Sequence, residues 1–185
     1  MPTHFRGKQM TTESSRKRKP RVSMLNAQAL RELLRYESAT GIFYWRNAVC
    51  NRPAGAKAGT TGKIGYVDIC VLKERHGAHR LAWLYVYGEW PKHEVDHVNG
   101  VRSDNRIENL RDVTHAVNTQ NLRSAHRRNT SSGLLGVRKA KDSHGYQANI
   151  HVNGKNHRIG RFATAEEAHA AYLDAKRKLH AGCSL

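Results

Sequence analysis

Long apolar runs are missing from this chain of 185 residues, and none approaches the roughly 20 residues that a membrane-spanning helix needs. An apolar export segment is missing as well. The three cysteines, Cys50, Cys70 and Cys183, form no C-x-x-C pair, so we expect reduced thiols, a cytoplasmic protein and no structural zinc. Hydrophobic residues make up 38% of the chain, which permits modest cores in one or two small domains.

Acidic residues are scarce, since 15 Asp and Glu stand against 32 Lys and Arg, for a formal net charge of +17. A basic chain of this kind favours a polyanionic partner, although a high pI alone also fits a protein that merely adheres to polyanions. Residues 94–122 are the exception and hold five acidic and three basic side chains. An acidic metal pocket inside a basic chain suits an enzyme that acts on nucleic acid.

That acidic stretch holds the most informative pattern in the chain. Asp96 and His97 end a short alternation of apolar and polar residues, Asn109 follows His97 by twelve positions, and Asn118 follows Asn109 by nine. A neutral imidazole can take a proton from water near neutral pH, whereas carboxylate and amide oxygens bind hard divalent cations. These groups together can hydrolyse a phosphodiester with metal assistance.

The local pattern predicts a strand at residues 94–98, a polar loop at 99–109 and a second strand at 110–113. A helix at 115–123 follows, with Thr114 as its N-cap. The order of these residues resembles the HNH endonucleases, in the variant whose last His is replaced by Asn. The resemblance implies a ββα-metal unit at 94–122. It implies that His97 is the general base, that Asn109 shapes the loop, and that Asp96 and Asn118 hold one Mg²⁺ or Mn²⁺ ion.

The preceding residues predict a small α+β module. Within residues 24–36, Leu30, Leu33 and Leu34 form a leucine stripe that predicts a helix. Strands are expected at 42–46 and 65–71, a mobile Gly/Ala-rich loop at 47–63, and a buried helix at 79–87. This part resembles the segment that precedes the HNH motif in phage-type endonucleases. The resemblance makes residues 22–122 one endonuclease domain. It also makes His79 and Arg80 phosphate contacts.

Two polar segments flank this domain. Residues 1–21 carry seven basic residues and one acidic residue, which predicts a disordered basic arm that either contacts phosphates or stays solvated. Residues 123–132 contain no large apolar residue, and we expect a basic linker that lies over the DNA backbone.

Residues 133–181 predict a three-stranded antiparallel sheet backed by one helix. Asn153-Gly154 is a strong hairpin signal, and a two-residue loop there pairs Val152 with Lys155, Asn149 with Arg158 and Ala148 with Ile159. Residues 136–138 supply a third strand, with Val137 facing inward and Arg138 outward. The helix follows a capping box at 164–167.

The motifs GVR, IGRF and TAEEAHAAY in this segment resemble the AP2 domain, which lays its sheet in the major groove of double-stranded DNA. The resemblance makes the polar sheet face the contact surface, through Arg138, Asn149, His151, Asn156 and Arg158. The plant-type pattern has more arginines and tryptophans at these positions, so its GC-rich target does not carry over. The alternative is a solvated polar face. Residues 182–185 form a tail.

Together these features predict an α+β fold and a metal-dependent DNA endonuclease, of the HNH homing type found in phages and prophages, targeted by an AP2-like sheet. We expect a monomer, without membrane contact, that nicks or cuts double-stranded DNA in a bacterial cytoplasm. The alternative is a non-catalytic, sequence-specific DNA-binding regulator with a degenerate HNH unit. An RNA-binding protein is disfavoured because nothing resembles the common RNA modules.

Overall fold

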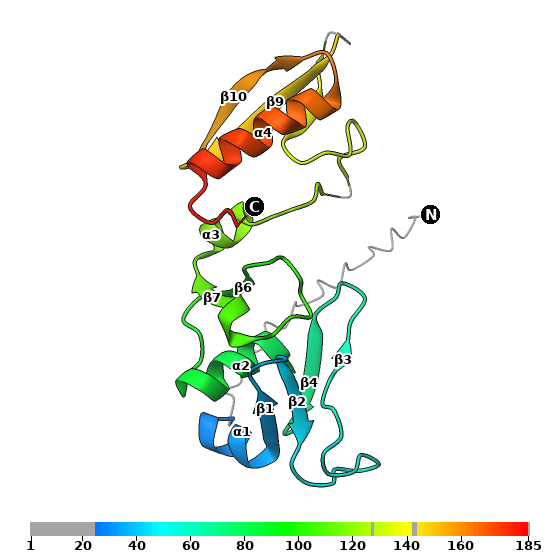
Figure 1. The fold of residues 1–185 in the computed structure, drawn as a ribbon, viewed down its shortest axis with the longest axis vertical. Helices are drawn as coiled ribbons and strands as arrows, with labels where there is room; N and C mark the ends of the chain where they lie inside the picture. The colour runs from blue at the N-terminus through cyan, green and yellow to red at the C-terminus, as the bar shows by residue number, and fades with distance from the viewer. Residues whose placement is uncertain (1–24, 127, 142–143, 185) are drawn as a thin grey trace, which may run out of the picture.

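The computed structural model describes residues 25–126, 128–141 and 144–184, so the basic arm predicted at residues 1–21 lies outside the described residues. The molecule is elongated, with one hydrophobic core near each end and helix α3 between them (Figure 1). The larger core holds buried apolar residues between Leu25 and Leu110, and the smaller core lies between Val137 and Tyr172.

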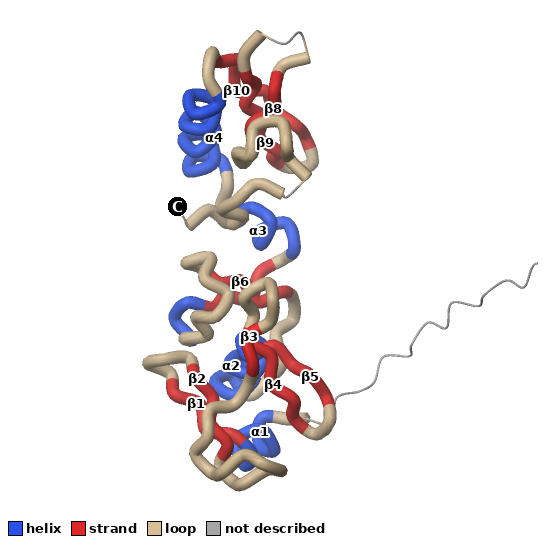
Figure 2. The backbone as a smooth tube through the Cα atoms, turned by 90° about the vertical axis from the view of Figure 1, so that its right-hand side faces the viewer, coloured by secondary structure: helices blue, strands red, loops and turns tan. Residues whose placement is uncertain are grey.

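Helices and strands alternate irregularly in the described ranges, as Figure 2 shows along the tube. Their order is α1 (Ala27–Leu33), β1 (Leu34–Glu37), β2 (Ile42–Trp45), β3 (Thr60–Thr61), β4 (Val67–Val71), β5 (Glu74–Gly77), α2 (Ala78–Tyr87), β6 (Glu94–His97), the 3-10 helix η1 (Ile107–Asn109), β7 (Leu110–Val113), α3 (His115–Gln120), β8 (Val137–Lys139), β9 (Tyr146–Val152), β10 (Lys155–Phe162) and α4 (Ala165–Leu179). The strands pair as β1–β2, β3–β4–β5, β6–β7 and β10–β9–β8. The fold is α+β, as the sequence predicts. In these ranges no helix has the length and apolar character needed to cross a bilayer.

Helix α1 is shorter than the leucine stripe predicts. Asn26 caps its N-terminus, and the chain passes directly into β1 at Leu34. Leu34 pairs with Trp45 of β2, and the turn at Gly41 brings the two strands together. The assignment of Leu34 to the helix was wrong, because strand pairing and burial in the core outweigh a modest helical propensity at the end of a short helix.

The Gly/Ala-rich segment 47–63, expected as a mobile loop, is instead bonded along β2. The backbone nitrogen of Ala58 donates a hydrogen bond of 2.7 Å to the carbonyl of Phe43, and Ala58 is 2% exposed. Gly59 has φ +100°, and a Cβ there would come within 2.9 Å of Ile69 and Val67. Small residues therefore let this segment lie flat on the core rather than move freely.

Strand β5 was not expected from the sequence. It forms a hairpin with β4 through Leu72 and Lys73, whose φ angles of 50° and 65° belong to a left-handed two-residue turn. Such turns favour Gly, Asn and Asp, so neither residue signals the reversal. The hairpin ends at Gly77, where α2 begins, and α2 ends at Gly88 as predicted.

The predicted strand-loop-strand-helix unit is present as β6, η1, β7 and α3. Strands β6 and β7 pair antiparallel, with Asp96 opposite Arg111 and His97 opposite Leu110. Helix α3 begins after Thr114, as predicted, but it ends at Gln120 rather than at residue 123.

The C-terminal unit, residues 133–184, has the predicted sheet and helix. Thr164 and Glu167 form the capping box of α4. Lys155 pairs with Val152 and Arg158 with Asn149, as the hairpin rule requires. A bulge between Arg158 and Gly160 shifts the register, so Ala148 pairs with Gly160 and the predicted pairing with Ile159 was wrong. The extra residue of a bulge leaves no sequence signature in the alternation of apolar and polar residues.

Candidate active site

A hollow of about 620 Å³ lies beside β6 and α3. Three of the predicted site residues line it together: Asp96, His97 and Asn118. Arg102 and Arg123 also line it, so two guanidinium groups lie beside the buried polar residues. Strand β6 supplies the first two residues and α3 supplies Asn118, and this placement follows from the short connection between β7 and α3.

His97 is 3% exposed, and its imidazole is held by a neighbouring amide. Its Nε2 lies 3.2 Å from Oδ1 of Asn105, while the amide nitrogen of Asn105 donates to the carbonyl of Ser103. Because that amide nitrogen already donates to Ser103, Oδ1 is the atom that faces His97, and it accepts a hydrogen bond from Nε2–H. The lone pair of His97 is therefore on Nδ1, the nitrogen left to act as a base.

Burial lowers the pKa of His97 below its ordinary value, and the hydrogen bond that His97 donates to Asn105 and the charge of Asp96 oppose this effect. The ring of His79 packs 5.3 Å from that of His97, between ring centres. Burial, followed by the nearby His97 and Arg80, lowers the pKa of His79 to about 4. Both imidazoles are therefore neutral at pH 7, which is the state that a general base requires.

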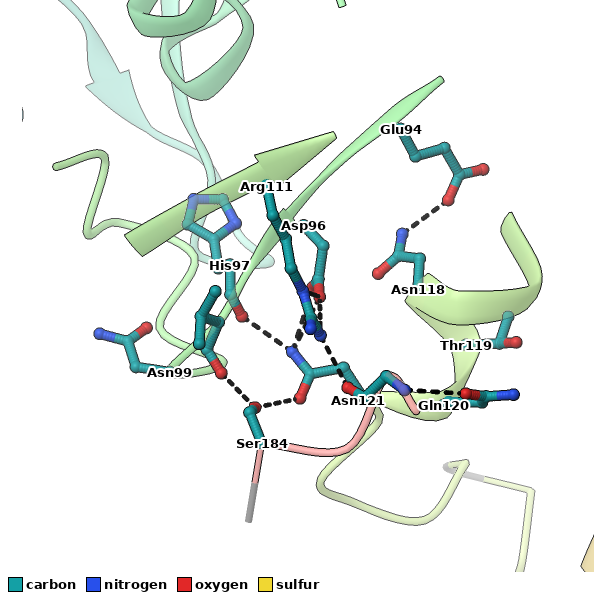
Figure 3. A network of polar contacts seen from close by, with 12 residues as sticks. Glu94, Asp96, His97, Asn99, Arg111, Asn118, Thr119, Gln120, Asn121 and Ser184 are labelled. Carbon is teal, nitrogen blue, oxygen red and sulfur yellow. Dashed lines mark hydrogen bonds and ion pairs between the residues drawn. The ribbon is translucent and has the colours of Figure 1, made fainter. Parts of the chain in front are cut away.

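Asp96 is 7% exposed and is surrounded by donors. Arg111 donates two hydrogen bonds to its Oδ2, at 2.9 and 2.7 Å. The amide nitrogen of Asn121 lies 3.1 and 3.2 Å from the two carboxylate oxygens and donates more closely, at 2.9 Å, to the carbonyl of His97 (Figure 3). The strong contacts fall on Oδ2, so Oδ1 is the less occupied oxygen of the pair.

Asn118 contacts Glu94 rather than Asp96. Its amide nitrogen donates a hydrogen bond of 2.6 Å to Oε2 of Glu94, and the other oxygen of Glu94 lies 2.8 Å from Nδ1 of His115. The hydrogen bond from Asn118, followed by that from His115, lowers the pKa of Glu94. The amide oxygen of Asn118 is turned to the side of Asp96 (Figure 3).

Asn109 does not line the hollow but ties the loop beneath it. Its amide nitrogen donates to the carbonyl of Asp104 at 2.8 Å, and its oxygen accepts from the backbone nitrogen of Asn99 at 2.9 Å. The Arg106 guanidinium beside Asp104 holds the pKa of that carboxyl down at about 2. Hydrogen bonds of Asn109 thus hold the loop between β6 and β7 in place, because Asn109 at its end is bonded to Asn99 at its start and to Asp104 in its middle.

The donor set fits a hard cation with few protein ligands. Asp96 and Asn118 each offer an oxygen to the same hollow, and Mg²⁺ is commonly held by one or two protein oxygens while it keeps its waters. Within the described ranges, no three His, Cys, Asp or Glu side chains gather as metal ligands. A site of this kind has open positions for phosphate oxygens and water.

The predicted DNA contacts lie on two separate surfaces. Arg80 is in the first turn of α2, donates to the carbonyl of His93 at 3.3 Å and packs its guanidinium over Trp90. The remaining five lie on one face of the C-terminal sheet, since directly opposed residues share a face: Arg138 opposite Gln147, Asn149 opposite Arg158, and His151 opposite Asn156. All five are exposed except Asn149, which is half-buried.

Several residues of the site were not expected from the sequence: Glu94, Asn105, Arg111, Asn121 and Ser184. Asn121 follows Asn118 by three positions, so helical spacing places both on one side of α3, and this signal was available. Asn105 and Ser184 lie in a loop and a tail, where spacing predicts no direction.

Residues 76–120 match the HNH endonuclease family. The match begins in β5, includes α2, β6, η1 and β7, and ends with α3. We call these residues the HNH segment. No curated protein and no solved structure matches the chain. The match thus supports nuclease activity in general for the HNH segment.

Proposed function

We propose that this chain is a metal-dependent DNA endonuclease that hydrolyses phosphodiester bonds at the hollow beside β6 and α3. The observation that carries the proposal is that a neutral buried imidazole, His97, lines one hollow together with Asp96 and Asn118, whose side chains contain oxygen, inside the HNH segment. A base and a cation site that share one small space are what phosphodiester hydrolysis needs.

Each residue has a distinct task in this mechanism. Nδ1 of His97 takes a proton from the attacking water, and Asn105 keeps the ring in the required tautomer. Asp96 and Asn118 would hold one divalent ion, Mg²⁺ or Mn²⁺, which when bound stabilises negative charge on the phosphate and the leaving oxygen. Arg102 and Arg123 flank the hollow and attract the DNA backbone.

We also propose that the C-terminal sheet targets the enzyme in the manner of an AP2 domain. Support comes from the exposed polar face that contains Arg138, His151, Asn156 and Arg158, in a basic chain. A two-stranded ribbon fits the major groove of B-DNA. The expected substrate is double-stranded DNA and the expected state is a monomer. An origin in a phage or prophage stays a prediction from the resemblance.

The test is cleavage of supercoiled plasmid by the full chain with Mg²⁺, with EDTA as the metal-free control. We expect nicked or linear product that EDTA abolishes and that His97→Ala reduces by at least about a hundredfold, the usual contribution of a general base. DNA affinity should survive in that variant. The ion pair between Asp96 and Arg111 favours a second candidate, a DNA-binding regulator with a degenerate site. Tight binding without Mg²⁺-dependent cutting would identify that candidate.

A further inference from the structure

The end of the chain returns to the HNH segment. Helix α4 ends at Leu179, and residues 181–184 then run beside α3, as the position of the C-terminus in Figure 1 shows. We call residues 181–184 the strap. It joins the C-terminal unit to the catalytic half a second time, in addition to the linker at residues 123–132.

Gly182 is the first anchor of the strap. Arg111 donates a hydrogen bond of 2.7 Å to the carbonyl of Gly182. The backbone nitrogen of Gly182 donates a hydrogen bond of 2.9 Å to Oε1 of Gln120. Gly182 is buried, and a Cβ there would come within 2.3 Å of the carbonyl oxygen of Val117. The strap therefore packs against Val117 only because glycine has no side chain at position 182.

Ser184 is the second anchor. Its hydroxyl lies 2.6 Å from Oδ1 of Asn121 and also approaches the carbonyl of Val98, and Arg123 donates to its carbonyl at 3.0 Å (Figure 3). Because the hydroxyl can donate to Oδ1 of Asn121, the amide nitrogen of Asn121 is left facing Asp96 and the carbonyl of His97. The strap thus fixes the helix end beside the hollow.

A third contact lies next to the strap. Lys176 of α4 is 1% exposed, and its ammonium group donates to the carbonyl of Leu122, the residue just before the linker. A buried ammonium needs such a partner, because an uncompensated charge in the interior is costly. The contacts of Lys176, Gly182 and Ser184 therefore tie the end of α4 and the strap to residues at and just after the end of α3.

The two halves face each other closely under this arrangement. A second hollow of about 670 Å³ lies between α3 and the sheet and is lined by Asn149, His151 and Asn156. It shares Thr119 and Leu122 with the hollow of the candidate active site. The two hollows therefore adjoin each other at Thr119 and Leu122, at and just after the end of α3.

We propose that the strap acts as a ruler, fixing the distance between the DNA site bound by the sheet and the phosphodiester that is cut. This proposal rests on the proposed function. Inside the linker, Arg123 donates to the carbonyl of Val98 and Asn129 donates to the carbonyls of Leu134 and Val137, so at most residues 124–128 connect the two anchored points. A flexible chain of about five residues spans about 12 Å on average, which corresponds to about four base pairs at roughly 3.4 Å each. The linker alone would therefore allow several cut positions, whereas the strapped molecule presents one.

The first experiment measures whether the strap is docked, without using activity. Cys183 lies in the strap and is partly buried, whereas Cys50 and Cys70 are exposed. In a Cys50→Ser/Cys70→Ser background, Cys183 is the remaining thiol, and its rate of reaction with a soluble disulfide reagent reports release of the strap. Gly182→Val should raise that rate about tenfold or more, because its side chain clashes with the carbonyl of Val117 and displaces the backbone, which breaks the two backbone hydrogen bonds of residue 182. The matched control is Ala181→Val, whose side chain is exposed.

The second experiment maps the cut on end-labelled DNA that contains a selected binding site. The ruler predicts one position for the wild-type chain and for Ala181→Val. It predicts cuts spread over several neighbouring phosphodiesters for Gly182→Val, with cutting of the labelled strand retained. Ser184→Ala, which leaves the backbone contacts in place, should give an intermediate spread.

Two outcomes would overturn the ruler while leaving the endonuclease proposal intact. One is a single unchanged cut position in Gly182→Val although Cys183 has become reactive. The other is a severalfold faster cut at the same position, which would identify the strap as an inhibitor. A wild-type chain that binds DNA but never cuts it would instead overturn the proposed function, and the ruler with it.

Discussion

Glu94 and Asn118 meet at 2.6 Å, and this contact sets the direction of the Asn118 amide. A carboxylate can only accept hydrogen bonds, so the group that faces it must be the amide nitrogen. The amide oxygen then faces the side of Asp96 (Figure 3). We therefore expect Glu94 to act as a positioning residue that orients Asn118, the proposed metal ligand, without touching the metal itself.

Glu94→Gln should weaken metal binding rather than remove activity. A glutamine can donate as well as accept, so it no longer forces one orientation on Asn118. Loss of such a supporting contact typically costs about tenfold or more in metal affinity. We expect the Mg²⁺ concentration for half-maximal plasmid cleavage to rise about tenfold, with activity restored at high Mg²⁺. Glu32→Gln, on the exposed side of α1, is the matched control. If Glu94→Gln and Glu32→Gln reach half-maximal cleavage at the same Mg²⁺ concentration, Glu94 does not position Asn118.

Asn118→Ala should lower activity more than Asn118→Asp does. Alanine removes one of few oxygen ligands, whereas aspartate keeps an oxygen at the same position. Asp96→Ala should likewise weaken the Mg²⁺ dependence or the activity, and it also leaves Arg111 without its carboxylate partner. Cleavage across a Mg²⁺ titration measures both effects. If Asn118→Ala cuts normally at every Mg²⁺ concentration, Asn118 is not a ligand.

The cleavage rate should rise with pH through a midpoint below pH 6.5. His97 acts as a base only when neutral, and burial lowers its pKa from the ordinary 6.5, so the neutral form predominates from a lower pH. The rate should therefore be close to its maximum at pH 7 and fall as His97 is protonated. Single-turnover cleavage between pH 5 and 8, at saturating protein, measures the midpoint. A midpoint above 6.5 would contradict the buried environment of His97.

His79 should make the fold less stable in mild acid. Its pKa is about 4 in the folded chain against an ordinary 6.5, so the unfolded chain binds the proton more tightly. Its contribution is complete above pH 6.5 and is lost as the pH falls toward 4, by about 2 kcal/mol between pH 7 and pH 5. Urea unfolding at both values measures the loss. His79→Gln should flatten the pH dependence by a similar amount, and an unchanged slope would show that His79 is protonated at little cost.

Arg158→Ala should change where the enzyme binds without changing how it cuts. A guanidinium that contacts a base edge contributes about 1–3 kcal/mol of discrimination, whereas one that contacts a phosphate weakens all sequences alike and lowers the salt slope by about one. Binding to a selected site and to random DNA at two salt concentrations distinguishes these cases. The pH profile of cutting should be unchanged.

Truncation after Ser132 should leave a weak, poorly selective nuclease. If the truncated chain binds and cuts the selected site as well as the full chain does, the sheet is not the targeting module.

The local elements of both halves could be predicted from the sequence. The alternation that ends at Asp96 and His97, the turn signal at Asn153 and the capping box at Thr164 act over a few residues, where backbone sterics and hydrogen bonding decide the outcome. The spacing from His97 to Asn118 then identified the residues that line one hollow.

The partners of those residues depended on the tertiary structure. The resemblance to the HNH endonucleases implied that Asp96 and Asn118 hold one ion, but which atoms meet depends on side-chain rotamers and on packing between distant segments. Glu94 accepts a hydrogen bond from the amide nitrogen of Asn118. Arg111 and Asn121 donate hydrogen bonds to the carboxylate of Asp96. The bulge after Arg158 and the turn at Leu72 likewise left no signal in composition.

The return of the C-terminal strap is the clearest case of a feature that only the tertiary structure decided. Residues 181–184 contain nothing that distinguishes them from a solvated tail in the sequence. Gly182 and Ser184 gain partners 61 to 86 residues away along the chain, and only after α4 has packed on its sheet and carried them to α3. Contacts of such long range depend on the position of whole elements, which no local pattern encodes.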